Sequence, residues 1–198
     1  FPRLRASCFQ YAYDTSLKLL APLDKLPPKK AQQIIQQAKL QAFNMAGDIC
    51  RLEVQKECLE YTFDRIQIEH GTDLDQETLR KIWGEAVNAC RRDVDHACLK
   101  FSEKFWQETG KFRSSYEAFQ NAVVSCDNKV KASCLEYVYG MEQAFRKTEL
   151  VAFGNAVSIC RDDTNGDCIQ LLYEKIIPDV QLGFDDTWAA AVKVCRRK

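Results

Sequence analysis

The sequence predicts an all-α fold, a disulfide-rich array of five helical hairpins arranged as a solenoid or as a compact helical bundle. Three observations predict it. Ten cysteines recur at regular spacing, the residues around them repeat with helical periodicity, and no segment alternates apolar and polar residues over the length of a strand. We expect one domain over residues 1–198, with repeats at about 8–50, 58–90, 98–126, 134–160 and 168–195.

The second half of each repeat ends in a cysteine that an aromatic residue precedes by seven positions and an alanine by four. The aromatic residues and their cysteines are Phe43 and Cys50, Trp83 and Cys90, Phe119 and Cys126, Phe153 and Cys160, and Trp188 and Cys195. Residues at i, i+3 and i+7 share one face of an α-helix. We therefore expect each aromatic, alanine and cysteine to form a buried stripe on a closing helix.

The first half of each repeat begins with the other class of cysteine, followed directly by an apolar residue and usually by an aromatic two positions later. These opening cysteines are Cys8, Cys58, Cys98, Cys134 and Cys168. In the fifth copy the aromatic is delayed to Tyr173. Helix breakers such as Pro22, Gly71 and Gly110 lie between the two halves, so the first opening helix is expected to end near Pro22.

The ten cysteines predict an oxidising compartment, because an even number of regularly spaced cysteines is typical of a disulfide framework. A zinc site would need CxxC or Cys/His clusters, and the sequence has neither. We therefore expect no metal and no cofactor, and a secreted, extracellular protein. The chain begins with Phe1-Pro2, which we interpret as a mature or trimmed form.

Two pairing schemes fit the spacing. Seven residues always separate a closing cysteine from the next opening one, whereas 26 to 42 positions separate the two cysteines of one repeat. In an antiparallel hairpin the start of the first helix lies beside the end of the second, so pairing within each repeat is favoured, starting with Cys8 and Cys50. Pairing across the junctions, such as Cys50 with Cys58, remains open. Each bridge is worth about 3–4 kcal/mol in the chain-entropy model.

Charge, hydropathy and motifs argue against several classes of function. Lys plus Arg and Asp plus Glu number 28 each, and this balance argues against a nucleic-acid partner. No run of about 18 apolar residues predicts a membrane span. Neither a GxSxG, HExxH or phosphate-binding glycine loop nor a histidine in a catalytic set occurs, so we expect no enzyme.

The most metal-like segment is Asp163 to Asp167 with Glu174, which places oxygen ligands at four positions of a calcium loop. Cys168 occupies the position that needs glycine, so we interpret the segment as a turn with Asp167 as helix N-cap. His70 precedes Gly71 and is expected at a helix C-terminus, and His96 is expected in a junction turn.

Aromatic residues crowd the opening helices, and most are expected in the core between hairpins. They are Tyr11, Tyr13, Tyr61, Phe63, Phe101, Phe105, Trp106, Tyr137, Tyr139 and Tyr173. In three copies both the third and the fifth residue after the opening cysteine are aromatic. These positions point about 160° apart on a helix, so one of the two is expected to face either a neighbouring repeat or outward, where it would be a candidate binding surface.

Two families share features with this chain. Tandem hairpins with cysteines seven residues apart are similar in spacing to bacterial Sel1-like solenoids, without their glycine-rich signature. The brackets that begin Cys8…Tyr11, Cys58…Tyr61 and Cys134…Tyr137 resemble the cysteine–tyrosine–cysteine (bicycle) proteins secreted by gall-forming aphids, although Phe101 and Leu171 replace tyrosine in other copies. This resemblance implies a salivary effector without established enzymatic chemistry.

The sequence thus predicts a secreted, non-enzymatic interaction protein with a protein partner, and the resemblance implies that the partner is a host protein. One alternative is a carrier of a small apolar ligand held between hairpins, and another is a hydrolase with an unrecognised pair of acids, which clustered acids with shifted pKa values in a cleft would favour. An enclosed apolar cavity of about 300 Å³ or more would favour the carrier. A solid core with an exposed aromatic patch would favour the interaction protein.

Overall fold

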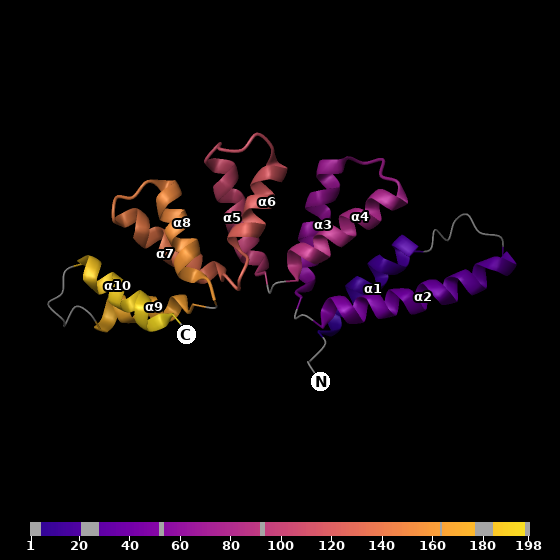
Figure 1. Ribbon diagram of the computed structural model, residues 1–198, viewed down its shortest axis with the longest axis horizontal. Helices are drawn as coiled ribbons and strands as arrows, with labels where there is room; N and C mark the ends of the chain where they lie inside the picture. The colour runs from indigo at the N-terminus through magenta and orange to yellow at the C-terminus, as the bar shows by residue number, and fades with distance from the viewer. Residues whose placement is uncertain are drawn as a thin grey trace. The chain divides into compact units, whose positions relative to one another are not determined.

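The computed structural model describes residues 5–20, 28–51, 54–91, 94–162, 164–176 and 184–196. Every regular element in these ranges is a helix, which confirms the predicted all-α class. The helices pair in chain order into five hairpins (Figure 1). Hairpin 1 is α1 (Ala6–Leu20) and α2 (Pro28–Cys50), hairpin 2 is α3 (Lys56–His70) and α4 (Gln76–Cys90), hairpin 3 is α5 (His96–Glu108) and α6 (Ser115–Ser125), hairpin 4 is α7 (Ala132–Ala144) and α8 (Glu149–Cys160), and hairpin 5 is α9 (Gly166–Leu171), continued by the π-helical segment η2 (Leu172–Ile176), and α10 (Phe184–Cys195).

Five disulfides join the opening cysteine of each hairpin to its closing cysteine. The bridges are Cys8–Cys50, Cys58–Cys90, Cys98–Cys126, Cys134–Cys160 and Cys168–Cys195. No cysteine is free. The pairing within each repeat is therefore the one present, because the antiparallel helices bring the start of one beside the end of the other. Each hairpin is closed by its own covalent link.

The opening helices of hairpins 1 and 2 end close to the predicted helix-breaking residues. α1 ends at Leu20, just before the predicted limit at Pro22, which lies outside the described residues. α3 ends at His70, as predicted, and Gly71 follows it with φ of 93°, a conformation that favours glycine. At the start of α4 the Asp75 side chain accepts a hydrogen bond from the Thr78 N–H at 2.7 Å.

Two local predictions are wrong. The side chain that caps α9 belongs to Asn165, which accepts the Cys168 N–H at 3.2 Å. Asp167 lies inside the first turn, because the helix already begins at Gly166. His96 is not in the junction turn but is the first residue of α5, since Asp95 caps that helix through the Ala97 N–H.

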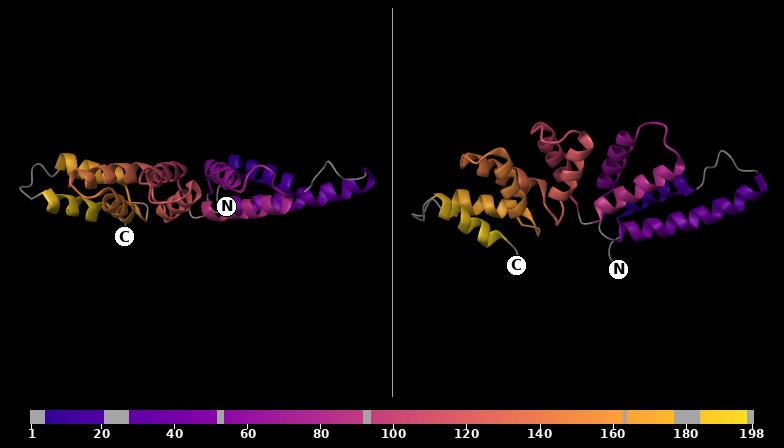
Figure 2. Two further views of the ribbon diagram at one scale, coloured as in Figure 1. Left: turned by 90° about the horizontal axis from the view of Figure 1, so that it is seen from above. Right: turned by 45° about the horizontal axis from the view of Figure 1, so that its top comes forward.

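The chain divides into two compact units, residues 1–93 with hairpins 1 and 2 and residues 94–198 with hairpins 3 to 5. Whether all five hairpins act as one domain stays a prediction. Within each unit consecutive opening helices are neighbours, α1 with α3, α5 with α7 and α7 with α9. The two helices of each hairpin lie side by side in Figure 1 and in the further views of Figure 2.

The core of each hairpin lies where the two helices meet. The alanine four residues before the closing cysteine is buried in all five copies, namely Ala46, Ala86, Ala122, Ala156 and Ala191. Hairpins 4 and 5 approach each other most closely at Gly166, where an added Cβ would lie 2.6 Å from the Cys134 Cα. Only glycine fits this position, so backbone contact sets the spacing of the last two hairpins.

Candidate interaction surface

Within each of the two units, consecutive hairpins meet through the aromatic residue that precedes the closing cysteine by seven positions. In each unit this ring packs on the opening helix of the preceding hairpin. Trp83 lies 5.9 Å from Tyr11 between ring centroids, and Trp188 lies 6.3 Å from Tyr137. Phe153 stacks on Phe105 at 3.9 Å. The predicted aromatic stripe is therefore the contact between hairpins.

The opening helices add a second row of contacts. Tyr139, five residues after Cys134, lies 6.1 Å from Phe101 and 5.5 Å from Phe105 in the preceding hairpin. The third and seventh residues after an opening cysteine thus point toward the following hairpin, and the fifth points back toward the preceding one. This explains why two aromatic positions on opposite sides of one helix are both needed in the core.

The closing helices complete the contact in the same way at two junctions. Between hairpins 1 and 2 a hollow of about 280 Å³ is lined by Met45 and Ile49 on α2 and by Trp83 and Val87 on α4. A hollow of about 220 Å³ between hairpins 4 and 5 is lined by residues at the same repeat positions, namely Asn155, Ile159, Trp188 and Val192. Residues five and one before the closing cysteine therefore face the following hairpin.

Each hairpin accordingly has two different faces. We call the side toward the preceding hairpin the front face, which contains the first and fifth residues after the opening cysteine and the seventh before the closing one. We call the side toward the following hairpin the rear face, which contains the third and seventh residues after the opening cysteine and the first and fifth before the closing one. A front face always meets a rear face within a unit.

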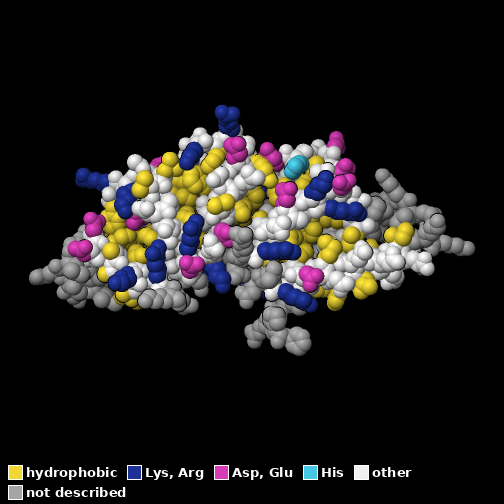
Figure 3. Space-filling view, in the orientation of Figure 1, with side chains coloured by type: hydrophobic (Ala, Val, Ile, Leu, Met, Phe, Trp, Pro, Cys, Tyr) yellow, Lys and Arg dark blue, Asp and Glu magenta, His cyan; other side chains and the backbone are white. Residues whose placement is uncertain are grey.

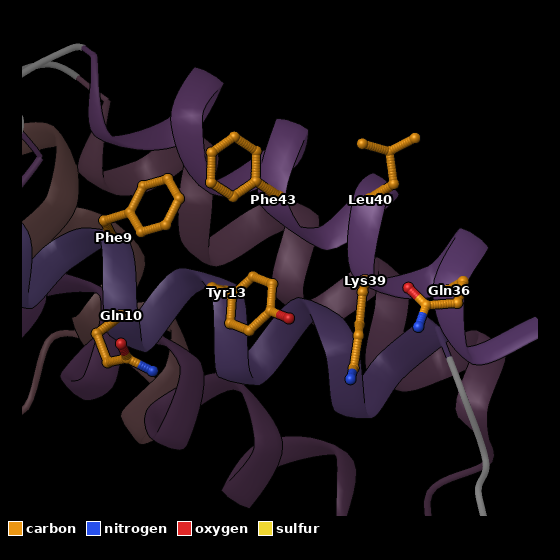
Figure 4. Close-up of a pocket in the computed structure, with 7 residues that line it drawn as sticks. All are labelled: Phe9, Gln10, Tyr13, Gln36, Lys39, Leu40 and Phe43. Atoms are coloured by element: carbon orange, nitrogen blue, oxygen red, sulfur yellow. The ribbon is translucent and has the colours of Figure 1, made fainter. Parts of the chain in front are cut away.

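The front face of hairpin 1 has no preceding hairpin in the part of the chain that the structure describes. Phe43 is 56% exposed and Leu40, one turn earlier, is 64% exposed. Phe9 and Tyr13 lie beside them, and the rings of Phe9 and Phe43 meet edge to face at 5.2 Å. These residues line an open groove of about 420 Å³ (Figure 4). Its polar side chains are Gln10, Gln36 and Lys39.

This exposure corrects one sequence prediction. Phe43 belongs to the aromatic stripe that was predicted to be buried, and the residues at its position in the other four hairpins are buried: Trp83, Phe119, Phe153 and Trp188. Phe9 is only half-buried, although its four counterparts are fully buried. The two helices of hairpin 1 do not bury either side chain by themselves.

The rear face of hairpin 5 is exposed at the other end of the repeat series. Leu171, three residues after Cys168, is 50% exposed, and Val194, directly before Cys195, is 71% exposed. At Val194's position hairpin 1 has Ile49, which is buried. The sequence pattern did not single out Leu171 or Val194, because their exposure depends on whether a following hairpin covers this face.

Of the two orientations predicted for the second aromatic position, the structure has the one toward a neighbouring hairpin, as Tyr139 shows. Each of the ten aromatic residues of the opening helices is buried or half-buried. Burial raises the pKa of Tyr11 to about 12, with a further contribution from the Asp64 carboxylate. Burial likewise raises the pKa of Tyr137 to about 12, assisted by Glu174. These phenols therefore stay neutral in the junctions between hairpins.

One buried carboxylate binds hairpins 4 and 5 together. Glu142, at the end of α7, is almost fully buried and accepts three hydrogen bonds. Lys147 Nζ and Asn155 Nδ2 each donate to Oε2 at 2.6 Å, and Trp188 Nε1 donates to Oε1 at 3.0 Å. The charge is compensated by Lys147, and the Trp188 hydrogen bond makes the arrangement a structural link between the two hairpins.

The remaining site candidates lie apart from these faces. His70 ends α3 and His96 begins α5. In the calcium-like segment Asp163 lies outside the described residues, and Cys168 is helical, as predicted. Asp185 and Asp186 lie in the first turn of α10, as expected for acids at a helix N-terminus. The described residues contain no group of three potential metal ligands.

The visible surface otherwise mixes charges of both signs with scattered hydrophobic side chains (Figure 3). Among the described helices, none is both long and apolar enough to cross a membrane. No protein-family model, curated protein or solved structure matches the chain.

Proposed function

We propose that this protein is an extracellular, non-enzymatic interaction protein that binds another protein through the front face of hairpin 1. One observation carries the proposal: Phe43 is 56% exposed at a position that the other four hairpins bury, and Phe9 beside it is only half-buried. Aromatic side chains that lose water on binding dominate the energetics of protein interfaces. A contiguous apolar patch on a stable scaffold is the usual sign of such a surface.

The extracellular part of the proposal rests on the disulfides. Five bridges that use all ten cysteines would not persist in a reducing compartment. They also stiffen each hairpin separately, so the front face is preorganised and loses little entropy on binding. The resemblance to the aphid bicycle proteins gives the finer form of the proposal, a salivary effector whose partner is a host protein.

The non-enzymatic part rests on the sequence, which contains no GxSxG or HExxH motif and no phosphate-binding glycine loop. The buried carboxylate of Glu142 is held by Lys147, Asn155 and Trp188 as a structural link. The carrier alternative requires an enclosed apolar cavity. The hollows lined by described residues are open to solvent, so no observation favours the carrier.

The test compares the oxidised full chain with two variants in affinity capture, followed by direct binding to the purified captured protein. Phe43→Asp places a charge in the centre of the front face and should weaken binding at least about tenfold, as expected for the loss of a hot-spot aromatic. Ile68→Asp is the matched control, since Ile68 is an equally exposed apolar residue on α3 outside that face. It should bind as the unchanged chain does.

Equal binding by all three proteins would contradict the proposal, because the front face would then not take part. Circular dichroism and a count of free thiols establish that each variant is folded and oxidised. A captured protein counts as a partner only when its direct binding is lost with Phe43→Asp and kept with Ile68→Asp.

A further inference from the structure

We infer that the front face of hairpin 1 binds the rear face of hairpin 5 of a second copy, so that copies associate head to tail. This inference rests on the proposed function and names the partner of the same face. It extends the contact between hairpins to a contact between molecules.

The first step is that the contact between hairpins has two unlike sides. Trp188 on a front face packs on Tyr137 of a rear face, and Trp83 packs on Tyr11 in the same way. The two faces of one hairpin therefore cannot replace each other. Any surface that continues the series at hairpin 1 must present a rear face.

The second step is that the described residues expose apolar side chains on the front face of hairpin 1 and on the rear face of hairpin 5. The front face carries Phe43, with Leu40 beside it one turn earlier, and the rear face carries Leu171 and Val194. These four residues are among the ten large hydrophobic side chains that the described residues expose. A terminal capping repeat typically has a polar outer face, whereas the outer faces of hairpins 1 and 5 carry apolar side chains at these four places.

The third step is that the repeat positions correspond. Leu171 occupies the position of Tyr11 and Tyr137, which receive the aromatic ring of the next hairpin. In the inferred contact Phe43 packs on Leu171 of the second copy. Val194 takes the place that Ile49 has on α2, beside the groove formed with the next closing helix. One contact thus covers both exposed faces, whereas an unrelated partner bound at hairpin 1 would leave the rear face of hairpin 5 exposed.

A contact between unlike faces leaves one free face at each end of the pair. It therefore adds further copies and produces open chains or closed rings. A contact of a face with itself would stop at a dimer instead. This difference makes the inference testable with two variants that each retain one face.

The experiment measures molar mass against concentration for the oxidised full chain by light scattering and sedimentation. The unchanged chain should gain mass as its concentration rises. Phe43→Asp, which retains the rear face, and the double variant Leu171→Asp with Val194→Asp, which retains the front face, should each remain monomeric. Mixed together, the two variants should form a one-to-one dimer, because one intact front face meets one intact rear face. Ile68→Asp should associate as the unchanged chain does.

Three results would overturn the inference. They are a chain that stays monomeric at every concentration, association that survives either face variant, and a mixture of the two variants that stays monomeric. The first of these leaves the proposed function standing if Phe43→Asp still abolishes binding of another protein. If Phe43→Asp abolished neither self-association nor the binding of another protein, both the inference and the proposed function would be contradicted. Circular dichroism excludes unfolding as the cause, and Leu40→Asp provides a second front-face variant at a more exposed site.

Discussion

Phe153 and Phe43 occupy the same position in hairpins 4 and 1, yet Phe153 is 1% exposed and Phe43 is 56% exposed. Phe153 packs against Phe101, Phe105 and Trp106 of the preceding hairpin. Phe43 meets only Phe9 of its own hairpin among the described ring contacts. The difference shows that a hairpin's own two helices do not bury this ring. In hairpin 4 the rings of the preceding hairpin supply the burial that hairpin 1 lacks.

A second comparison concerns the tryptophans of hairpins 5 and 2. Trp188 donates its indole N–H to Glu142, eight residues after Cys134. At the same repeat position in hairpin 1 the residue is Ser16, and neither the Ser16 hydroxyl nor the Trp83 N–H has a hydrogen-bond partner in the described part of the chain. The aromatic contact is therefore common to both junctions, whereas the polar link is particular to the later one.

The largest expected effect sharpens the first comparison. Phe153→Ala should lower the free energy of unfolding by about 3–5 kcal/mol, because it removes a fully buried ring and leaves a cavity. Phe43→Ala should change it by less than about 0.5 kcal/mol, since the ring is largely solvated. Denaturant unfolding of both variants without reductant measures the difference. Equal losses would mean that Phe43 is buried in solution, as the inferred association of copies requires at high concentration.

The next effect concerns the polar link. Glu142→Ala should cost about 2–3 kcal/mol, because it leaves the buried donors of Trp188 and Asn155 without an acceptor. Ser16→Ala should be neutral or slightly stabilising, since the hydroxyl that it removes is buried without a partner. Thermal and denaturant unfolding give both values. Glu142→Gln keeps one carbonyl acceptor, so its cost in unfolding free energy should lie between those of Ser16→Ala and Glu142→Ala. If Ser16→Ala cost as much stability as Glu142→Ala, the comparison would be refuted.

The smallest effect is a dependence of stability on pH. The pKa values of Tyr11 and Tyr137 are about 12 in the folded chain and 10.0 in the unfolded one. The unfolded chain therefore releases these protons first, and stability should fall as pH rises from 10 to 12 while it stays constant below 10. Replacing both residues by phenylalanine should reduce this loss of stability at high pH. Denaturant midpoints measured at pH 8, 10 and 11 test this. The pH dependence of stability should be the same for the variant and the unchanged chain below pH 10 and should differ above it.

Much of the architecture could be predicted because it depends on local periodicity. The spacing of Phe153, Ala156 and Cys160 places all three on one helix face. The opening helices of hairpins 2 and 3 end just before Gly71 and Gly110, as expected for helix-breaking residues. The candidate surface could not be predicted in the same way. Leu40 and Val194 are ordinary apolar residues in the sequence, and Phe43 has the pattern of a buried one.

By itself, the sequence determined the helical class, the five repeats and the residues that form each stripe, because these follow from spacing along one helix. Two matters were decided only by the tertiary structure. It joined Cys8 to Cys50 rather than Cys50 to Cys58, since disulfide partners must be neighbours in space. It also left the front face of hairpin 1 and the rear face of hairpin 5 exposed, because the burial of a face depends on the neighbouring hairpin that covers it.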